Sequence, residues 1–352
     1  MWLRIFKHKG HEVHKGRILL SFIVVVSFVF FISACMKSSD CSSKEVFCVG
    51  LVTDTLGIED HGVNQDAWAG LQNVKNYGIV DQVAYIESVD TRDYEKNIAY
   101  FANHGYDVII TSGMGLRDET LRSANLYGDI IFVGINQPME KEEIRANIIP
   151  VTFPEDQMGF FAGALAARIT KTGIVGAVCE DSGIDSMWRY CEGFRAGVKF
   201  TDKKIKPLIL YRDNGDREKL FLDEIWGYNT ASDMIQRGAD VVFAAGGVTA
   251  QGAIRATVES RVKAIGAERD QAAAMGETNF QVVTSVYGDA QFEVEKILRG
   301  MKGENIGAQA RSPIKFIPLG PKLPENLTSD INMLLIKLWS QEIKTNIAKE
   351  KP

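Results

Sequence analysis

The sequence predicts an α/β fold of two Rossmann-like lobes with parallel sheets, joined by a three-strand hinge. Short apolar strands alternate with helical patterns along the chain, as in βαβ units. The clearest unit lies at residues 49–71, where a buried strand ends at Thr53 and Asp54, a polar loop with glycines follows, and a helix opens near Asn64. Open α/β sheets bind ligands beyond the carboxyl ends of their strands. We therefore expect the ligand at this loop.

The two halves of the chain repeat one another. The sequence Val-Gly-x-Val opens the first strand of each half, at residues 49–52 and 175–178, and each strand ends in acid, Asp54 in one and Glu180-Asp181 in the other. Two further strands match in order, at residues 105–110 and 238–243, and at residues 131–135 (followed by Asn136) and 262–266 (followed by Glu268). This order predicts two lobes of the same topology facing each other across a cleft.

The N-terminus has the pattern of an export signal. Five basic residues precede an apolar run at residues 18–32, and Ser33-Ala34-Cys35 follows. The run is short for a membrane span, although an uncleaved anchor helix is the alternative. Ile-Ser-Ala-Cys resembles the lipobox of bacterial lipoproteins, which implies cleavage before Cys35 and its acylation. Several acyl chains hold a protein firmly on a bilayer, and residues 36–44 then read as a flexible tether.

Charge and cysteine content exclude some functions. The chain has 352 residues, and removal of residues 1–34, which hold five Lys/Arg and one Glu, leaves 35 basic and 44 acidic residues, formally −9. This balance disfavours nucleic acid as a partner. Cys41, Cys48, Cys179 and Cys191 do not have the spacing of a zinc site. A Cys179–Cys191 disulfide and buried free thiols are both open, and we expect no metal and no cofactor.

The predicted boundaries follow from these patterns. We expect a signal peptide at residues 1–34, a lipidated tether at 35–45, a first lobe from 46–152 plus 285–312, and a second lobe from 153–284 plus 313–352. The crossings fall near residues 150–154, 284–287 and 313–317. A helix at residues 289–301 would return to the first lobe, and a terminal helix at about 329–348 would pack on the second.

The run TDTLGIEDHGVNQDAWAGL resembles the opening of the BMP (basic membrane protein) family of lipoproteins. The stretches VTFPEDQMGFFAGALAARITKTGIVGAV, EGFRAGVKF, QRGADVVFAAGG, AIGAERDQ and VVTSV support the resemblance, which covers residues 46–303. The family has the type I periplasmic-binding fold, and characterised members bind purine nucleosides for ABC transporters. The resemblance therefore implies that fold and a solute-binding function.

The resemblance also implies ligand residues. Asp54 matches an acid at the first strand end, and Asn64 matches the Asn of an Asp-Lys-Ser-Phe-Asn motif. Gly246 and Gly247 match a glycine pair whose backbone lies against the ligand. Glu268 and Asp270 match an Asp-x-Asp that holds ribose hydroxyls.

This chain departs from the family pattern at four places. Val63 replaces a stacking Phe, Asn136 replaces an Asp, and Tyr287-Gly288 replaces a Lys. Residues 212–216 replace a Gly-Ser-Phe segment with a second aromatic. Trp188, in the loop after the second lobe's first strand, is a candidate to replace the lost ring. The acids that would bind the sugar hydroxyls are thus retained more fully than the aromatic residues that would stack on the base.

Each candidate also has a purely structural interpretation. Asp54 and Asn64 could organise the start of the following helix, and Trp188 could pack in the core or lie on an exposed rim. Glu268 and Asp270 could be surface acids. His61 could touch the ligand where the family has Lys.

We predict a binding protein, not an enzyme, that is lipid-anchored to the cell membrane on the extracytoplasmic face (periplasm or cell surface). It would capture a small polar solute, first of all a purine nucleoside, and deliver it to an ABC permease. The alternative is a sensor lipoprotein that presents a sugar or signalling molecule to a membrane receptor. An enzyme that uses Glu268 and Asp270 as acid and base is a third hypothesis.

Overall fold

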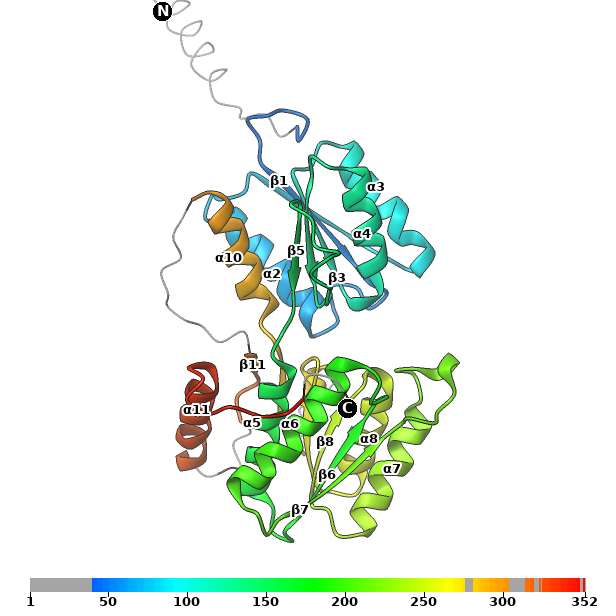
Figure 1. Cartoon of the computed structure of the whole chain (residues 1–352), viewed down its shortest axis with the longest axis vertical. Helices are drawn as coiled ribbons and strands as arrows, with labels where there is room; N and C mark the ends of the chain where they lie inside the picture. Colours follow the sequence, from blue (N-terminus) through cyan, green and yellow to red (C-terminus); the bar gives the residue numbers. More distant parts are fainter. Residues whose placement is uncertain are drawn as a thin grey trace, which may run out of the picture.

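The computed structural model describes residues 40–275, 281–303, 314–319, 323, 325–348 and 351, which form two α/β lobes (Figure 1). The first lobe has a parallel five-stranded sheet of order β2-β1-β3-β4-β5. Its strands are β1 (Cys48–Thr53), β2 (Gln82–Glu87), β3 (Val108–Ser112), β4 (Ile131–Ile135) and β5 (Ile148–Val151). Helices α2 (Val63–Asn76) and α10 (Ala290–Met301) cover one face, and α3 (Tyr94–Asn103) and α4 (Arg117–Leu126) the other.

The second lobe has a six-stranded sheet of order β11-β10-β9-β8-β6-β7, in which only β11 is antiparallel. Its strands are β6 (Ile174–Cys179), β7 (Lys206–Tyr211), β8 (Val241–Ala245), β9 (Lys263–Ala267), β10 (Val282–Gly288) and β11 (Ile314–Phe316). Its helices are α5 (Glu155–Ile169), α6 (Asp185–Thr201), α7 (Glu224–Gln236), α8 (Gly247–Glu259), α9 (Gln271–Ala274) and α11 (Glu325–Trp339). Helices α5 and α6 lie on one face of the sheet and α7 and α8 on the other (Figure 1). The predicted fold class is confirmed.

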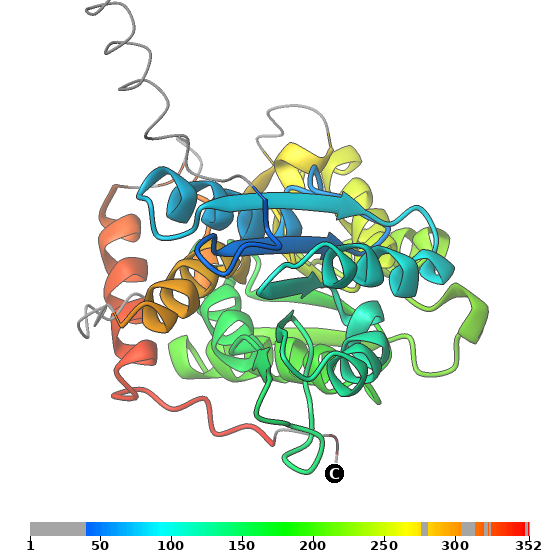
Figure 2. The same ribbon diagram turned by 90° about the horizontal axis from the view of Figure 1, so that it is seen from above.

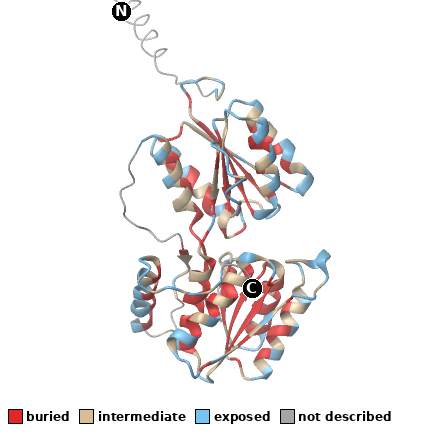
Figure 3. Cartoon of the chain, viewed as in Figure 1, coloured by how far each residue is buried: buried red, intermediate tan, exposed pale blue. Residues whose placement is uncertain are grey.

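The central strands of both sheets are buried on both faces, as is typical of parallel sheets (Figure 3). In β1, Val49 and Leu51 pack on the α2 side of the sheet and Val52 on the α3 side. The repeated glycine of Val-Gly-x-Val has the same cause in both lobes. A Cβ at Gly50 would lie 2.6 Å from the Phe101 ring, and a Cβ at Gly176 would lie 2.7 Å from the Met234 sulfur. Each first strand therefore lets one large side chain of a covering helix approach its backbone.

Two hinge crossings lie in the described chain. The first follows β5 at residues 152–154, and the second follows β10 between Gly288 and Asp289. Residues 285–288, which the sequence division assigned to the first lobe, stay in the second sheet because Val286 pairs with Ala267 of β9 and with Phe316 of β11. Residues 304–312, also assigned to the first lobe, lie outside the described residues.

The returning helix and the terminal helix lie where the sequence predicts them, with different ends. Helix α10 packs on α2, where a Cβ at Gly70 would lie 2.8 Å from the Gln291 carbonyl oxygen. Helix α11 buries Ile331, Leu334 and Leu338 but ends at Trp339, well before residue 348. The chain then continues without regular structure (Figure 2).

Two disulfides join the four cysteines of the described residues. Cys179 at the end of β6 pairs with Cys191 of α6, which decides between the two possibilities left open above. Cys41 pairs with Cys48 at the start of β1. The second pairing shortens the predicted tether of residues 35–45, because the disulfide fixes the chain to the lobe from Cys41 onward. The chain also lies close to the lobe at this point, since a Cβ at Gly105 would lie 2.8 Å from the Cys41 carbonyl oxygen.

The predicted signal and Cys35 lie outside the described residues. Within the part of the chain that is described, no helix is both long and apolar enough to cross a membrane.

Candidate functional site

A cavity of about 510 Å³ lies between the lobes and receives residues from both. Its walls follow the carboxyl ends of strands, with Asp54 after β1, Gly113 after β3, Asn136 after β4, Gly247 after β8 and Glu268 after β9. This is where open α/β sheets place ligands. The volume is in the range of small-molecule sites.

Asp54 is the central acid of the first-lobe wall. Asn64 Nδ2 donates to Asp54 Oδ1 at 2.8 Å and to the Gly57 carbonyl at 3.0 Å, and the Leu56 amide also donates to Asp54 Oδ1. Burial raises the pKa of Asp54, and the Asn64 hydrogen bond opposes this only in part. Asn64 itself does not line the cavity. The structure therefore places Asn64 behind Asp54, as a positioning residue.

The loop before α2 is held by Asp60, which the sequence analysis missed. The Asp60 carboxylate accepts hydrogen bonds from the backbone amides of Gly62, Asn64 and Gln65, at 2.8, 3.1 and 3.0 Å. The sequence signal was present, since an acid just before a helix start commonly takes these free amides. Asp60 is buried and also lines the cavity.

The same loop contacts the second lobe across the cavity. Gly62 and Arg269 form an antiparallel bridge, and the Asp270 amide donates to the His61 carbonyl at 2.8 Å. His61 thus contacts the other lobe through its backbone and is absent from the cavity lining.

Glu268 and Asp270 have different roles although they are two residues apart. Glu268 lines the cavity, and its Oε2 accepts from the amides of Gly246 and Gly247 at 2.9 and 2.8 Å, at the N-terminus of α8. The positive end of that helix favours a carboxylate there. The side chain of Asp270 instead caps α9 through the Ala272 and Ala273 amides, and Asp270 lies outside the cavity lining. The two carboxylates do not form an acid–base pair in the cleft.

Trp188 does not line the cavity. Its Nε1 donates to the Ala348 carbonyl at 3.2 Å, and its ring stacks on Tyr211 with centroids 5.9 Å apart. The side chain therefore contacts the C-terminal segment, and it does not replace the missing aromatic ring.

Phe221 supplies an aromatic ring that the sequence analysis missed. It lines the cavity and has a positive φ of 61°, which is unusual for a bulky residue. The loop of residues 212–223 has no regular pattern, so its sequence does not indicate which residue points inward. Phe221 lies five residues beyond the segment where the resemblance placed a lost aromatic.

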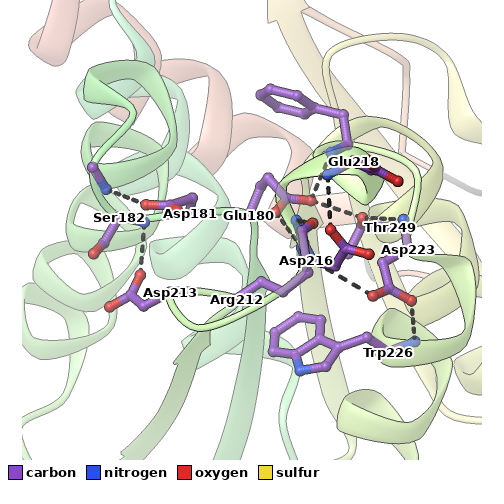
Figure 4. Close-up of polar contacts among 12 residues, drawn as sticks. Glu180, Asp181, Ser182, Arg212, Asp213, Asp216, Glu218, Asp223, Trp226 and Thr249 are labelled. Atoms are coloured by element: carbon purple, nitrogen blue, oxygen red, sulfur yellow. Dashed lines mark hydrogen bonds and ion pairs between the residues drawn. The ribbon is translucent and has the colours of Figure 1, made fainter.

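A buried ion pair holds the Phe221 loop in place (Figure 4). Arg212 Nε lies 2.5 Å from Glu180 Oε1, and the two side chains are 1% and 0% exposed. Glu180 Oε2 accepts from the Phe221 amide at 3.1 Å and from Thr249 Oγ1 at 2.7 Å. Arg212 Nη2 donates to the Asp216 carbonyl at 3.0 Å. The loop is thus folded around one buried charge pair.

The walls combine aromatic faces with acids. Tyr94, Phe153, Tyr190 and Tyr287 line the cavity with Phe221, and the lining holds four acids, Asp54, Asp60, Glu155 and Glu268, against one base, Arg269. Burial and the nearby Asp54 raise the pKa of Tyr94 to about 12, so its phenol is neutral. Such a site suits a ligand with a flat apolar part and several hydroxyl or amino groups.

Similarity to known proteins identifies the family of this chain. The model of the family described as "ABC transporter substrate-binding protein PnrA-like" matches residues 47–347. The CD4+ T-cell-stimulating antigen of Listeria innocua is 29% identical over 248 residues, which cover 67% of this chain and 66% of that protein. The ABC transporter nucleoside-binding protein BmpA of Lactococcus lactis is 27% identical over 266 residues, or 73% of this chain and 71% of that protein.

Solved structures agree on the fold. An ABC transporter solute-binding protein from Conexibacter woesei superposes with a TM-score of 0.65 at 20% identity, over 85% of this chain and 98% of that one. The protein described here therefore belongs to the PnrA-like family of ABC transporter substrate-binding proteins, which bind a solute and are not enzymes.

Proposed function

We propose that this substrate-binding protein captures a purine nucleoside between its lobes and delivers it to an ABC permease. The observation that carries the proposal is the cavity itself, which sets Phe221 and tyrosine rings beside carboxylates at strand ends. Aromatic faces suit a purine base. Carboxylates such as Asp54 and Glu268 suit vicinal sugar hydroxyls, because hydrogen bonds to a charged acceptor are strong. The nucleoside-binding relative from L. lactis supports this ligand class.

The proposed binding step needs no chemistry. Solute entering between the lobes gains contacts from both walls, so it binds the closed form more tightly and shifts the population toward it. The bridge between Gly62 and Arg269 is a contact that an opening of the lobes would break. The permease would then recognise the closed arrangement.

We further propose that Cys35 carries the lipid anchor and that the first lobe sits close to the bilayer. The Cys41–Cys48 disulfide ties the chain to the lobe only six positions after Cys35. An extended chain of six residues spans at most about 20 Å. Such a short link would keep the protein beside a membrane-embedded permease.

The first experiment is a thermal-shift screen of a soluble form that begins at Asp40, against nucleosides, free bases and simple sugars. A ligand that binds only the folded state stabilises it by about 2.7 kcal/mol at a hundredfold excess over its Kd. We expect a shift with adenosine, guanosine or inosine that is lost in Asp54→Asn and kept in Asp129→Asn, an exposed acid outside the cavity lining. Shifts with a sugar and with no nucleoside would discard the nucleoside assignment and leave the family intact.

A further inference from the structure

The second-lobe wall of the cavity holds two polar groups that the proposed function does not use. Glu155 is the first residue of α5, directly after the first hinge crossing, and Ser186 is the second residue of α6. Both line the cavity, and Glu155 is only 6% exposed. Ser186 Oγ is a buried atom without a hydrogen-bond partner among the described residues, and Glu155 Oε2 is ion-paired with Arg189 but accepts no hydrogen bond from a described residue. Buried polar atoms of this kind are few in folded proteins and call for an explanation.

The charge of Glu155 is only partly balanced. Arg189 Nη1 lies 2.9 Å from Glu155 Oε2, but the same guanidinium also pairs with Asp156 Oδ1 at 2.8 Å. Burial raises the pKa of Glu155 to about 7, against the opposing effect of Arg189, while Asp156 and Asp185 add to the rise. Burial, together with the nearby charges of Glu155 and Glu268, raises the pKa of Tyr190 well above its usual value, so its phenol stays neutral.

We propose that Glu155 and Ser186 form a polar subsite that takes a hydrogen-bond donor of the ligand, namely an amino group, a ring N–H or a hydroxyl. This proposal rests on the proposed function for the identity of the ligand as a nucleoside. An ionised carboxylate only accepts hydrogen bonds, and a serine hydroxyl can accept one as well. An anionic group is disfavoured at the same place by the Glu155 charge.

The subsite discriminates between ligands because a ligand without the matching donor leaves a buried acceptor unpaired, which costs free energy. A buried acceptor without a donor retains its desolvation penalty. A site built to bond a particular N–H or O–H therefore rejects an analogue that lacks this group far more strongly than it rejects a change of size. Glu155 and Ser186 thereby become specificity residues, in addition to the acids at the strand ends.

The test compares nucleosides that differ by one donor. Isothermal titration would use adenosine against purine riboside, guanosine against inosine, and each nucleoside against its deoxy analogues, on the wild type, Glu155→Gln and Ser186→Ala. We expect one pair in which the wild type prefers the donor-bearing ligand about tenfold or more. Both variants should abolish this preference and leave the affinity for the poorer ligand nearly unchanged.

Matched controls separate this role from a structural one. Glu192→Gln removes a carboxylate of α6, the helix that holds Ser186; it pairs with Arg195 and lies outside the cavity lining. Ser260→Ala removes an exposed serine. Both should keep the wild-type preference. Equal changes for all nucleosides, or none, in the Glu155 and Ser186 variants would overturn the proposal. If the wild type binds a sugar and no nucleoside, the proposed function fails, and the same variants are tested on sugar and deoxysugar pairs.

A pH profile gives an independent readout. The groups that face Glu155 are Arg189, Asp185 and Tyr190 from α6 and Asp156 from α5, with Glu268 across the wall near Tyr190. The affinity for the donor-bearing ligand should fall as the pH drops from 8 to 6, because protonation removes the charged acceptor. Asp54 also lines the cavity, so the decisive quantity is the difference between wild type and Glu155→Gln. Identical profiles for these two proteins would contradict the proposal.

Discussion

Asp54 and Glu180 follow the first strands of the two lobes, yet their surroundings differ. Asp54 lies in the cavity wall, with hydrogen bonds from Asn64 and the Leu56 amide and no ion pair to a basic side chain among the described residues. Glu180 is fully buried and pairs with Arg212, and it holds Thr249 and the Phe221 amide. The acid that follows the first strand thus faces the cavity in the first lobe and holds a loop in place in the second.

The helices differ between the lobes as well. Helices α5 and α6 cross at close range, because a methyl group at Gly163 would overlap the Phe194 carbonyl oxygen and one at Gly197 would overlap the Phe160 carbonyl oxygen. Helices α2 and α10 of the first lobe approach less closely at Gly70. The second lobe is built as the tightly packed half, with a buried ion pair that presents Phe221. The first lobe contributes loops held by side-chain caps.

The largest expected effect comes from breaking the buried pair. Arg212→Met leaves Glu180 as an uncompensated buried charge and should destabilise the protein by about 3–5 kcal/mol. Chemical denaturation would measure this, and the double variant Glu180→Gln/Arg212→Met should recover part of the loss. Arg237→Met, which breaks an exposed pair with Asp233 at the C-terminal end of α7, should cost about 0.5 kcal/mol or less. Equal costs for the two arginines would refute the structural role of Arg212.

The helix contact is the next test of the comparison. Gly163→Ala should cost about 1–3 kcal/mol, because a methyl group has no room between α5 and α6. Gly300→Ala in α10 has nothing within 4 Å of the new Cβ and should stabilise its helix by up to about 1 kcal/mol. Thermal unfolding of both variants gives the answer. Stabilisation by Gly163→Ala as well would contradict the close contact between α5 and α6.

Asp54→Asn tests the other side of the comparison. We expect a loss of ligand affinity of about tenfold or more, since a charged acceptor becomes neutral, without a loss of stability. Because burial raises the pKa of Asp54, its contribution to stability is present at low pH and is lost as the pH rises through the folded-state pKa. The stability of Asp54→Asn relative to wild type should therefore increase with pH. Destabilisation at pH 8 would place Asp54 with Glu180, as a structural acid.

The smallest effect is expected for Trp188. Trp188→Phe removes one hydrogen bond to the Ala348 carbonyl and should cost about 1 kcal/mol or less. Ligand affinity should stay at the wild-type value, as measured by titration, because the side chain contacts the C-terminal segment. A large loss of affinity would restore Trp188 to the ligand site.

The outcome at the cavity follows from how local each signal is. Asp54 and Asn136 follow strands of the first sheet, and Gly247 and Glu268 follow strands of the second. The order of strands is therefore enough to bring each pair to the carboxyl edge of its own sheet, where ligands bind. Asn64 and Asp270 lie near these edges, but the Asn64 side chain donates to Asp54 and the Asp270 side chain caps α9. The position of a residue in a βα loop was therefore predictable, while its side-chain direction was not.

The sequence by itself determined the two-lobed α/β fold, through its strand periodicity and its repeated Val-Gly-x-Val openings, and it indicated the family. Tertiary structure decided which side chains meet in the cavity. Phe221 enters because Glu180 and Arg212, 32 residues apart, hold its loop. Glu155 and Ser186 share a wall because α5 and α6 pack together. Contacts between residues so distant in sequence depend on how whole helices and strands pack, and local sequence patterns do not predict them.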